Sequence, residues 1–222
     1  MFKTEKEFDS IISKEWGEPV IWDGITNLES YMKTSPKILW ILKEGNEHKK
    51  ENRNHREFHQ NVKIYSKWKS TYKNIILSSY GILNNLEYKD LPPLNDEAMI
   101  NDDIVLDKTA LINVNKNGGG GHANHTLIEL NYTKHKAILL QQIEGINPDV
   151  IINCSRVNRL FNDVAEKYRL EKKEYSSEYN KTINYAYNSE KLLINYWHPA
   201  SRMKDEKYQK QLLDIYKIWK AK

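Results

Sequence analysis

Short, mostly apolar runs alternate along the chain with longer stretches in which apolar residues recur every three or four positions. Four of the short runs stand out, and they are Ile38–Leu42, Thr109–Val114, Asp149–Asn153 and Leu192–Asn195. Apolar runs of this length are typical of strands buried on both faces, as in a parallel sheet. We therefore predict four strands at these positions.

Amphipathic stretches between these runs predict the helices. They cover Glu5–Glu15, Val62–Leu86, Leu127–Ile146, Val157–Leu170 and Asp205–Trp219. Strands that alternate with helices indicate parallel pairing through right-handed crossovers. The predicted fold is α/β, a three-layer sandwich with a central four-stranded parallel sheet flanked by helices. The 222 residues are expected to form one domain, with residues 1–35 as an N-terminal helical extension.

Three polar segments interrupt this alternation. Glu47–Gln60 is dense in Lys, Arg, His and Asn, so it is predicted to be a solvated loop, or a mobile basic lip if it lies beside the strand ends. Lys89–Asp103 contains two adjacent prolines and several acidic residues, which favour an irregular connection. Glu171–Ser189 is polar and rich in tyrosine, and we expect a hairpin there.

Composition limits the function classes. Hydrophobic residues make up 39% and aromatic residues 11% of the chain, which argues against a disordered protein. A net charge of +4 permits nucleic-acid binding without demanding it. Cys154 is the single cysteine, so an intramolecular disulfide and a cysteine-rich zinc or iron–sulfur site are excluded. No apolar run is long enough for a bilayer and the first ten residues are too charged for a signal peptide, so we expect a cytoplasmic protein without a membrane partner.

Polar loops follow three of the four predicted strands: Lys43–Asn46, Asn113–His125 and His198–Arg202. The carboxyl ends of parallel strands meet at one edge of a sheet, where open α/β folds bind their ligands. We therefore expect Glu44, Asn113 or Asn115, and His198 to converge on one pocket.

Two common cofactor patterns are absent from these loops. No Gly-Lys-Ser/Thr follows the glycines 118–121, and the dinucleotide spacing is missing, so a nucleotide cofactor is not expected. The histidines at 122, 125 and 135 lack paired spacing with a nearby carboxylate, and a metal needs three or four well-placed ligands. We expect neither a cofactor nor a metal.

In their order along the chain, these loops resemble the uracil-DNA glycosylase superfamily. The most specific pieces are Leu111-Ile112-Asn113 followed by the glycine–histidine loop, and His198-Pro199-Ala200-Ser201-Arg202. The resemblance runs from about Pro36 to Met203 by element order. It implies the fold given above and a DNA N-glycosylase without lyase activity, outside the iron–sulfur branches.

The resemblance also implies roles for individual residues. Glu44 stands in place of a water-activating aspartate, Asn46 in place of a tyrosine that blocks C5-substituted bases, and His198 donates to the base oxygen. Substrate contacts are expected from Asn113, which reads the base, together with Asn115, Phe58 and Gly45. Arg202 resembles the residue that fills the space vacated in the duplex. The expected DNA contacts are Lys116, Gly119, Gly120, His122, Ser201, Arg202 and Met203.

A target base must leave the stack to be read on its Watson–Crick edge, and an asparagine amide suits that task because it both donates and accepts. The expected substrate is a flipped-out deaminated or modified pyrimidine, such as a bulky 5-substituted cytosine of foreign DNA, in repair or in antiviral defence. An aromatic residue, Phe58 or Tyr65, could instead close the pocket that Asn46 leaves open. Two other functions stay open: a catalytically silent nucleic-acid-binding module of the same fold, and an N-glycosidase acting on free nucleosides or nucleotides. We expect the protein to be a monomer that binds DNA and has no protein partner.

Overall fold

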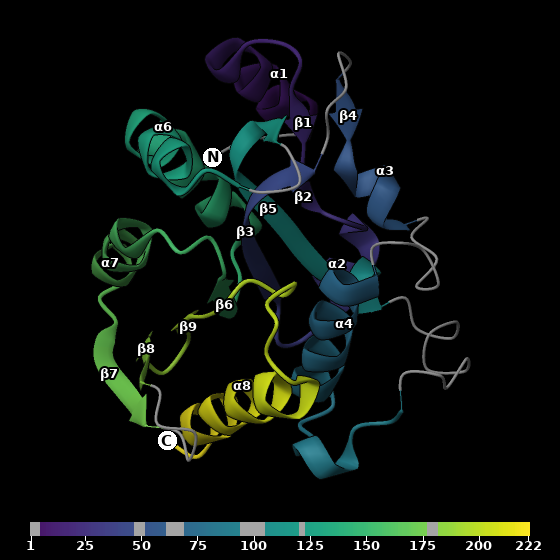
Figure 1. Cartoon of the computed structure of the whole chain (residues 1–222), viewed down its shortest axis with the longest axis vertical. Helices are drawn as coiled ribbons and strands as arrows, with labels where there is room; N and C mark the ends of the chain where they lie inside the picture. Colours follow the sequence, from purple (N-terminus) through teal and green to yellow (C-terminus); the bar gives the residue numbers. More distant parts are fainter. Residues whose placement is uncertain (1–4, 47–51, 61–68, 94–104, 120–122, 177–181) are drawn as a thin grey trace.

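A seven-stranded mixed sheet forms the centre of the molecule in the computed structural model, which describes residues 5–46, 52–60, 69–93, 105–119, 123–176 and 182–222 (Figure 1). The strand order is β2-β5-β3-β6-β9-β8-β7. The four predicted strands are the four in the middle, and they are β5 (Thr109–Gly119), β3 (Ile38–Asn46), β6 (Val150–Asn153) and β9 (Leu192–Asn195). All neighbours within this group pair in parallel.

The prediction that the sheet has only four parallel strands is wrong at both edges. The two-residue strand β2 (Gly24–Ile25) pairs antiparallel with β5. On the other side, β8 (Thr182–Tyr187) pairs antiparallel with β9 and with β7 (Glu171–Ser176), so the predicted hairpin is confirmed. A two-residue strand is too short to give a pattern. The almost fully exposed, charged β7 lacks the apolar run that reveals a buried strand.

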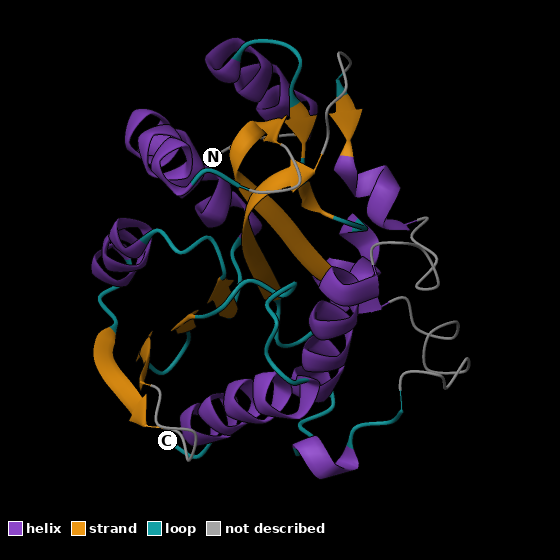
Figure 2. Cartoon of the chain, viewed as in Figure 1, coloured by secondary structure: helices purple, strands orange, loops and turns teal. Residues whose placement is uncertain are grey.

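Helices cover both faces of the sheet (Figure 2). On one face lie α1 (Glu5–Trp16), α6 (His125–Ile146) and α7 (Asn158–Lys167), which contribute apolar side chains to one buried cluster. On the other face lie α4 (Lys69–Leu83) and α8 (Asp205–Lys220). The α/β architecture with a layer of helices on each side of the sheet is therefore as predicted.

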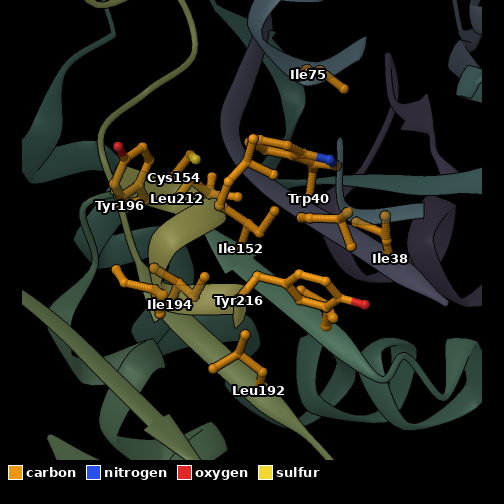
Figure 3. Close-up of a cluster of buried hydrophobic side chains, with 14 of the residues drawn as sticks. Ile38, Trp40, Ile75, Ile152, Cys154, Leu192, Ile194, Tyr196, Leu212 and Tyr216 are labelled. Atoms are coloured by element: carbon orange, nitrogen blue, oxygen red, sulfur yellow. The ribbon is translucent and has the colours of Figure 1, made fainter. Parts of the chain in front are cut away.

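Alternation along each strand divides the side chains between the two faces. In β3, Trp40 is fully buried on the face of α4 and α8, where its indole N–H donates to Ser79 Oγ at 3.0 Å. Figure 3 shows it in one cluster with Ile75 of α4 and Tyr216 of α8. Ile41 is fully buried on the opposite face. The continuous apolar runs thus have the burial on both faces that their composition predicts.

The first 35 residues contain more than a helix. They also include β1 (Ile21–Trp22), β2 and the short helix α2 (Leu28–Lys33). Because β2 is an edge strand and α1 shares a core cluster with α6, this segment is part of the domain core.

The predicted solvated loop at 47–60 is wrong for the part that is described. Residues 53–60 form β4 (Arg53–Asn54), which pairs in parallel with β1, and α3 (His55–Gln60). His55, Arg56 and His59 are buried there, since polar side chains of this helix face the strand ends rather than water. The described part of this segment instead lies beside the strand ends, which is the alternative position predicted from the sequence.

The remaining predicted elements agree apart from their ends. The helix expected over Val62–Leu86 is described as α4 from Lys69, and residues 61–68 lie outside the description. The helix expected over Val157–Leu170 stops at Lys167, and Arg169 adopts a left-handed φ of 53°. The irregular connection at 89–103 is described only to residue 93 and begins in a short 3-10 helix, Tyr88–Asp90. None of the helices in the described ranges is long and apolar enough to cross a membrane.

Candidate active site at the carboxyl edge of the sheet

Strands β3 and β5 continue past the point at which β6 ends. β6 stops at Asn153, which lies level with Ile41. The further pairs between β3 and β5 are Leu42 with Asn113, Glu44 with Asn115, and Asn46 with Gly119. The register shifts between the last two pairs, and a shift of this kind bends a strand and re-aims its side chains. The polar ends of β3 and β5 therefore project together beyond the core.

A pocket of about 110 Å³ lies at this edge. Its lining comes from β3, β5, α3, α4 and the loop after β9, and consists of Leu42, Glu44, Gly45, His55, Phe58, His59, Thr71, Tyr72, Asn113 and His198. A cavity of about 150 Å³ holds a benzene ring, so this pocket is on the scale of one aromatic ring. The prediction that Glu44, Asn113 and His198 share one pocket is confirmed.

The carboxylate of Glu44 is held by its own sheet partner. Asn115 Nδ2 donates to Glu44 Oε2 at 3.0 Å, and Asn115 Oδ1 accepts from the backbone N–H of Asn117 at 3.2 Å. A Cβ atom on Gly119 would lie 2.0 Å from the carboxyl carbon of Glu44. Asn115 and Gly119, predicted as substrate and DNA contacts, therefore act here by positioning Glu44: one orients the carboxylate and the other leaves it room.

His198 has its proton placed by the loop that carries it. The N–H of Ala200 donates to His198 Nδ1 at 3.2 Å, so the single proton of the neutral ring is on Nε2. Burial, with a smaller contribution from the nearby charge of Lys43, lowers the pKa of His198 to about 4. The ring is therefore a neutral N–H donor at pH 7.

The His198 loop is anchored to α4. Pro199 is buried and its carbonyl accepts from Asn74 Nδ2 at 2.7 Å, while the N–H of Ser201 donates to the carbonyl of His198 at 2.8 Å. Proline fixes its own φ and restricts the residue before it. These contacts hold the imidazole at a fixed position on the pocket wall.

Asn113 is supported from behind by Asp23, a residue that no sequence pattern singled out. Asp23 Oδ2 accepts both from the backbone N–H of Asn113, at 2.7 Å, and from its Nδ2, at 3.2 Å. The side chain of Asp23 is fully buried. It lies 90 positions before Asn113 in the chain, so no local pattern links the two residues.

Lys116, predicted to contact DNA, does not face solvent. Its side chain is fully buried, and its ammonium group contacts Asp23 Oδ1 at 2.5 Å and Gln142 Oε1 at 2.8 Å. Burial lowers the pKa of Lys116, and the carboxylate of Asp23 opposes that effect. The prediction is wrong because the alternating strand β5 turns this side chain under the sheet, towards α6.

Helix α3 supplies the wall that the sequence assigned to a solvated loop. Phe58 lines the pocket, as predicted, and its ring lies 5.9 Å from that of His59. His59 is buried, and burial together with His55 lowers its pKa to about 3. A Cβ atom on Gly45 would lie 2.6 Å from the His55 ring, so this glycine lets the helix approach β3 closely. The histidine-rich run thus faces the pocket.

The other predicted contacts have mixed outcomes. Arg202 is exposed on the His198 loop, whereas Met203 is partly buried and packs against the hydrophobic core. Ser201 is half-buried on the same loop. The side chain of Asn46 and all of Gly120, His122 and Tyr65 lie outside the described residues.

No group of three or more metal-ligating side chains occurs among the residues that the structure describes. His135 is stacked on Trp16, with ring centroids 3.8 Å apart, and is therefore a packing residue of α6. His125 lies at the exposed start of the same helix, with its Nε2 3.9 Å from Glu129.

Comparison with known proteins adds no assignment: no family model matches the chain, and neither does any curated protein. A function must therefore be inferred from the geometry of the pocket.

Proposed function

We propose that this protein is a DNA N-glycosylase that takes a deaminated or modified pyrimidine out of the duplex and hydrolyses its N-glycosidic bond. One observation carries the proposal. An acidic side chain of β3, an amide of β5 and a neutral imidazole of the loop after β9 line a pocket on the scale of a single ring. These three groups match the three requirements of the reaction: attack by water, recognition of the base and stabilisation of the departing base.

In the proposed reaction the bond between C1′ of the sugar and the ring nitrogen of the base breaks, and its electron pair leaves with the base. The Nε2–H of His198 donates to the base oxygen on which negative charge accumulates. Because its pKa is about 4, the ring gives this hydrogen bond as a neutral donor at pH 7. Glu44 faces the positive charge that develops on the sugar and accepts a proton from the water that attacks C1′.

The size of the pocket favours a small base. A volume of about 110 Å³ leaves little room beyond one ring, and Phe58 lies on its wall. The hypothesis of a bulky 5-substituted cytosine requires extra space beside Asn46. We therefore propose a pyrimidine with no C5 substituent, or a small one, as the preferred substrate.

The test uses matched duplex and single-stranded DNAs that carry uracil, thymine, cytosine, 5-hydroxymethylcytosine or a bulky 5-substituted cytosine. Each is incubated with the protein and then with alkali, which breaks the strand at abasic sites. The expected result is breakage at one small pyrimidine, and its loss in His198→Ala. Breakage only at the bulky base would overturn the proposed substrate, and no breakage with any base would overturn the glycosylase.

A second candidate is an N-glycosidase for free nucleosides or nucleotides. The burial of Lys116 favours it, because one of the phosphate contacts expected for DNA is not available. Release of the free base from deoxyuridine or its monophosphate, without strand breakage in DNA, would indicate this activity. Tight, salt-sensitive DNA binding without any base release would instead indicate the silent binding module.

A further inference from the structure

The carboxylate of Asp23 is fully buried and has every acceptor position occupied. Its Oδ2 accepts two hydrogen bonds from Asn113, and its Oδ1 accepts from Lys116 Nζ at 2.5 Å and from Gln142 Nε2 at 3.0 Å. Gln142 Oε1 in turn accepts from Lys116 at 2.8 Å, and its Nε2 also donates to the backbone carbonyl of Asp23. A buried charge needs this degree of satisfaction. Of the four residues in this network, Asn113 is the one among the described lining residues of the pocket.

A second ion pair lies next to this network. Arg56 of α3 contacts Asp9 of α1, at 2.5 Å between Nη2 and Oδ2, and is buried. A Cβ atom on Gly24, next to Asp23, would lie 4.0 Å from Arg56 and 3.9 Å from Gln142, which places the two ion pairs side by side. Four charged groups on α1, α3, β5 and the β1–β2 connection therefore lie close together.

We propose that Asp23 is a positioning residue which, paired with Lys116, holds the side-chain amide of Asn113 in one of its two orientations and thereby determines which hydrogen-bonding edge of a base the pocket accepts. The inference extends the proposed function to a further residue and depends on it. A carboxylate can only accept, so the NH₂ group of Asn113 must face Asp23. The amide oxygen and the second N–H then keep fixed places.

The orientation of this amide separates two classes of pyrimidine. A 4-oxo pyrimidine such as uracil presents a donor at ring position 3 and an acceptor at position 4, and a 4-amino pyrimidine such as cytosine presents the reverse. One amide orientation complements the first pattern and the flipped orientation complements the second. In the wild-type protein the flip would bring the amide oxygen of Asn113 against the Asp23 carboxylate, so one class is rejected.

The decisive variant replaces the buried ion pair by apolar groups: Asp23→Leu combined with Lys116→Met. Asp23 Oδ2 accepts from both the backbone N–H and the side-chain NH₂ of Asn113, whereas leucine neither donates nor accepts, so nothing at position 23 then favours either orientation of the Asn113 amide. Removing the charge of Lys116 at the same time avoids an uncompensated buried cation. The matched control is Asp163→Asn, which removes a carboxylate that accepts from Tyr132 and Lys136 away from the pocket.

The first measurement does not need catalysis. The side-chain NH₂ signals of Asn113 are identified by NMR from their loss in Asn113→Ala, and their exchange with water is measured. We expect exchange about tenfold faster in the double variant than in the wild type and in Asp163→Asn. Wild-type signals that exchange as fast as those of an exposed asparagine would overturn the inference, even if the double variant does not fold.

The second measurement compares base release from DNAs that carry 4-oxo and 4-amino pyrimidines. We expect the ratio of the two single-turnover rates to fall at least tenfold in the double variant, whereas a merely structural defect would slow both rates alike and leave the ratio unchanged. An unchanged ratio would overturn the inference. If no base is released by the wild type, the proposed function fails, and the NMR measurement still decides whether Asp23 orients Asn113.

Discussion

Three strands of the sheet contain the same short sequence, and the structure uses the asparagine of each differently. Each strand has two aliphatic residues before an asparagine, as in Leu111-Ile112-Asn113 of β5 and Ile151-Ile152-Asn153 of β6. The third, Leu193-Ile194-Asn195, lies in β9. Their local sequences offer no reason to treat them differently. In the structure, only Asn113 lines the pocket with Glu44 and His198.

The amides of β6 and β9 are satisfied by close neighbours. Asn153 Nδ2 donates to the carbonyl of Val157 and to Asn195 Oδ1, and its Oδ1 accepts from both the N–H and the hydroxyl of Ser155. Asn195 Nδ2 continues the chain of amides to Asn158, the first residue of α7. These contacts close the strand-to-helix turn. They give Asn153 a structural role.

The amide of β5 depends on distant support instead. Asn113 is held by Asp23, 90 positions away, and Asp23 is in turn held by Lys116 and Gln142. Partners within four positions and on the adjacent strand thus accompany Asn153, and a buried charge network accompanies the asparagine that lines the pocket. Substitutions in the charge network, in the pocket and in the strand-to-helix turns can separate the structural role from the proposed functional one. The largest loss of stability is expected from a substitution in the charge network.

Replacing Lys116 with Met should cause the largest loss of stability. The substitution leaves the carboxylate of Asp23 buried without its cation, which typically costs 3–5 kcal/mol of unfolding free energy, on the order of half the stability of a domain. Urea denaturation at pH 7 measures the loss. Binding of DNA by the folded fraction should keep its salt dependence, because Lys116 is not at the surface; a shallower salt slope would restore Lys116 as a phosphate contact.

His198→Ala should lower single-turnover base release by a hundredfold or more, about 2.7 kcal/mol of transition-state stabilisation for one preorganised donor. Its unfolding free energy should change little, since the ring lines a pocket. Arg202→Ala is the companion on the same loop, and it should weaken action on duplex DNA more than on single strands. A His198→Ala rate equal to that of the wild type would rule out the donor role.

Gly119→Ala should disturb Glu44 without touching the base. The added methyl group would lie 2.0 Å from the carboxyl carbon of Glu44, which is the far end of a flexible side chain, so the carboxylate should be displaced with little loss of stability. The carboxylate must move, so base release should fall while DNA affinity stays. A Glu44→Gln variant, which removes the charge but not the bulk, is the comparison. Full activity in Gly119→Ala would show that the position of Glu44 does not matter.

The pH dependence of stability tests the burial of two histidines. The folded protein holds the pKa of His198 at about 4 and that of His59 at about 3, below the 6.5 expected for the unfolded chain. Below pH 6.5 the unfolded chain therefore takes up protons that the folded chain does not, and stability falls as the pH is lowered towards 4, by up to about 1.4 kcal/mol per pH unit and histidine. Urea midpoints between pH 7 and pH 4.5 measure this slope. His59→Phe should flatten it, and an unchanged slope would contradict the burial of His59 as its cause.

Much of the fold follows from the apolar pattern, because buried strands need continuous apolar runs. Four strands and the hairpin were predicted, and the starts of β3, β5 and β9 agree to the residue. β5 was predicted to end at Val114, since its next residues are polar and contain glycine. They stay in the sheet because β3 pairs with them as far as Gly119.

The site was predictable where chain order alone brings residues to one edge, as for Glu44, Asn113 and His198. The site was not predictable where a side chain of a type that usually lies at the surface is buried. Lysine is mostly exposed and histidine is seldom fully buried, yet Lys116 and His59 are buried by contacts with residues far away in the chain or on another helix. Asp23 is likewise a polar residue that is buried by contacts with residues far away in the chain.

The most direct test of the account replaces Asn113, Asn153 and Asn195 with Ala one at a time. Base release from the preferred modified DNA is then measured for each under single-turnover conditions, beside its unfolding free energy. We predict that Asn113→Ala loses a hundredfold or more in rate, whereas Asn153→Ala loses about 1–3 kcal/mol of stability, the cost of unsatisfied buried partners, and keeps its rate. Asn195→Ala should behave like Asn153→Ala. Equal rate losses in all three variants would contradict the assignment of the active site to the ends of β3 and β5.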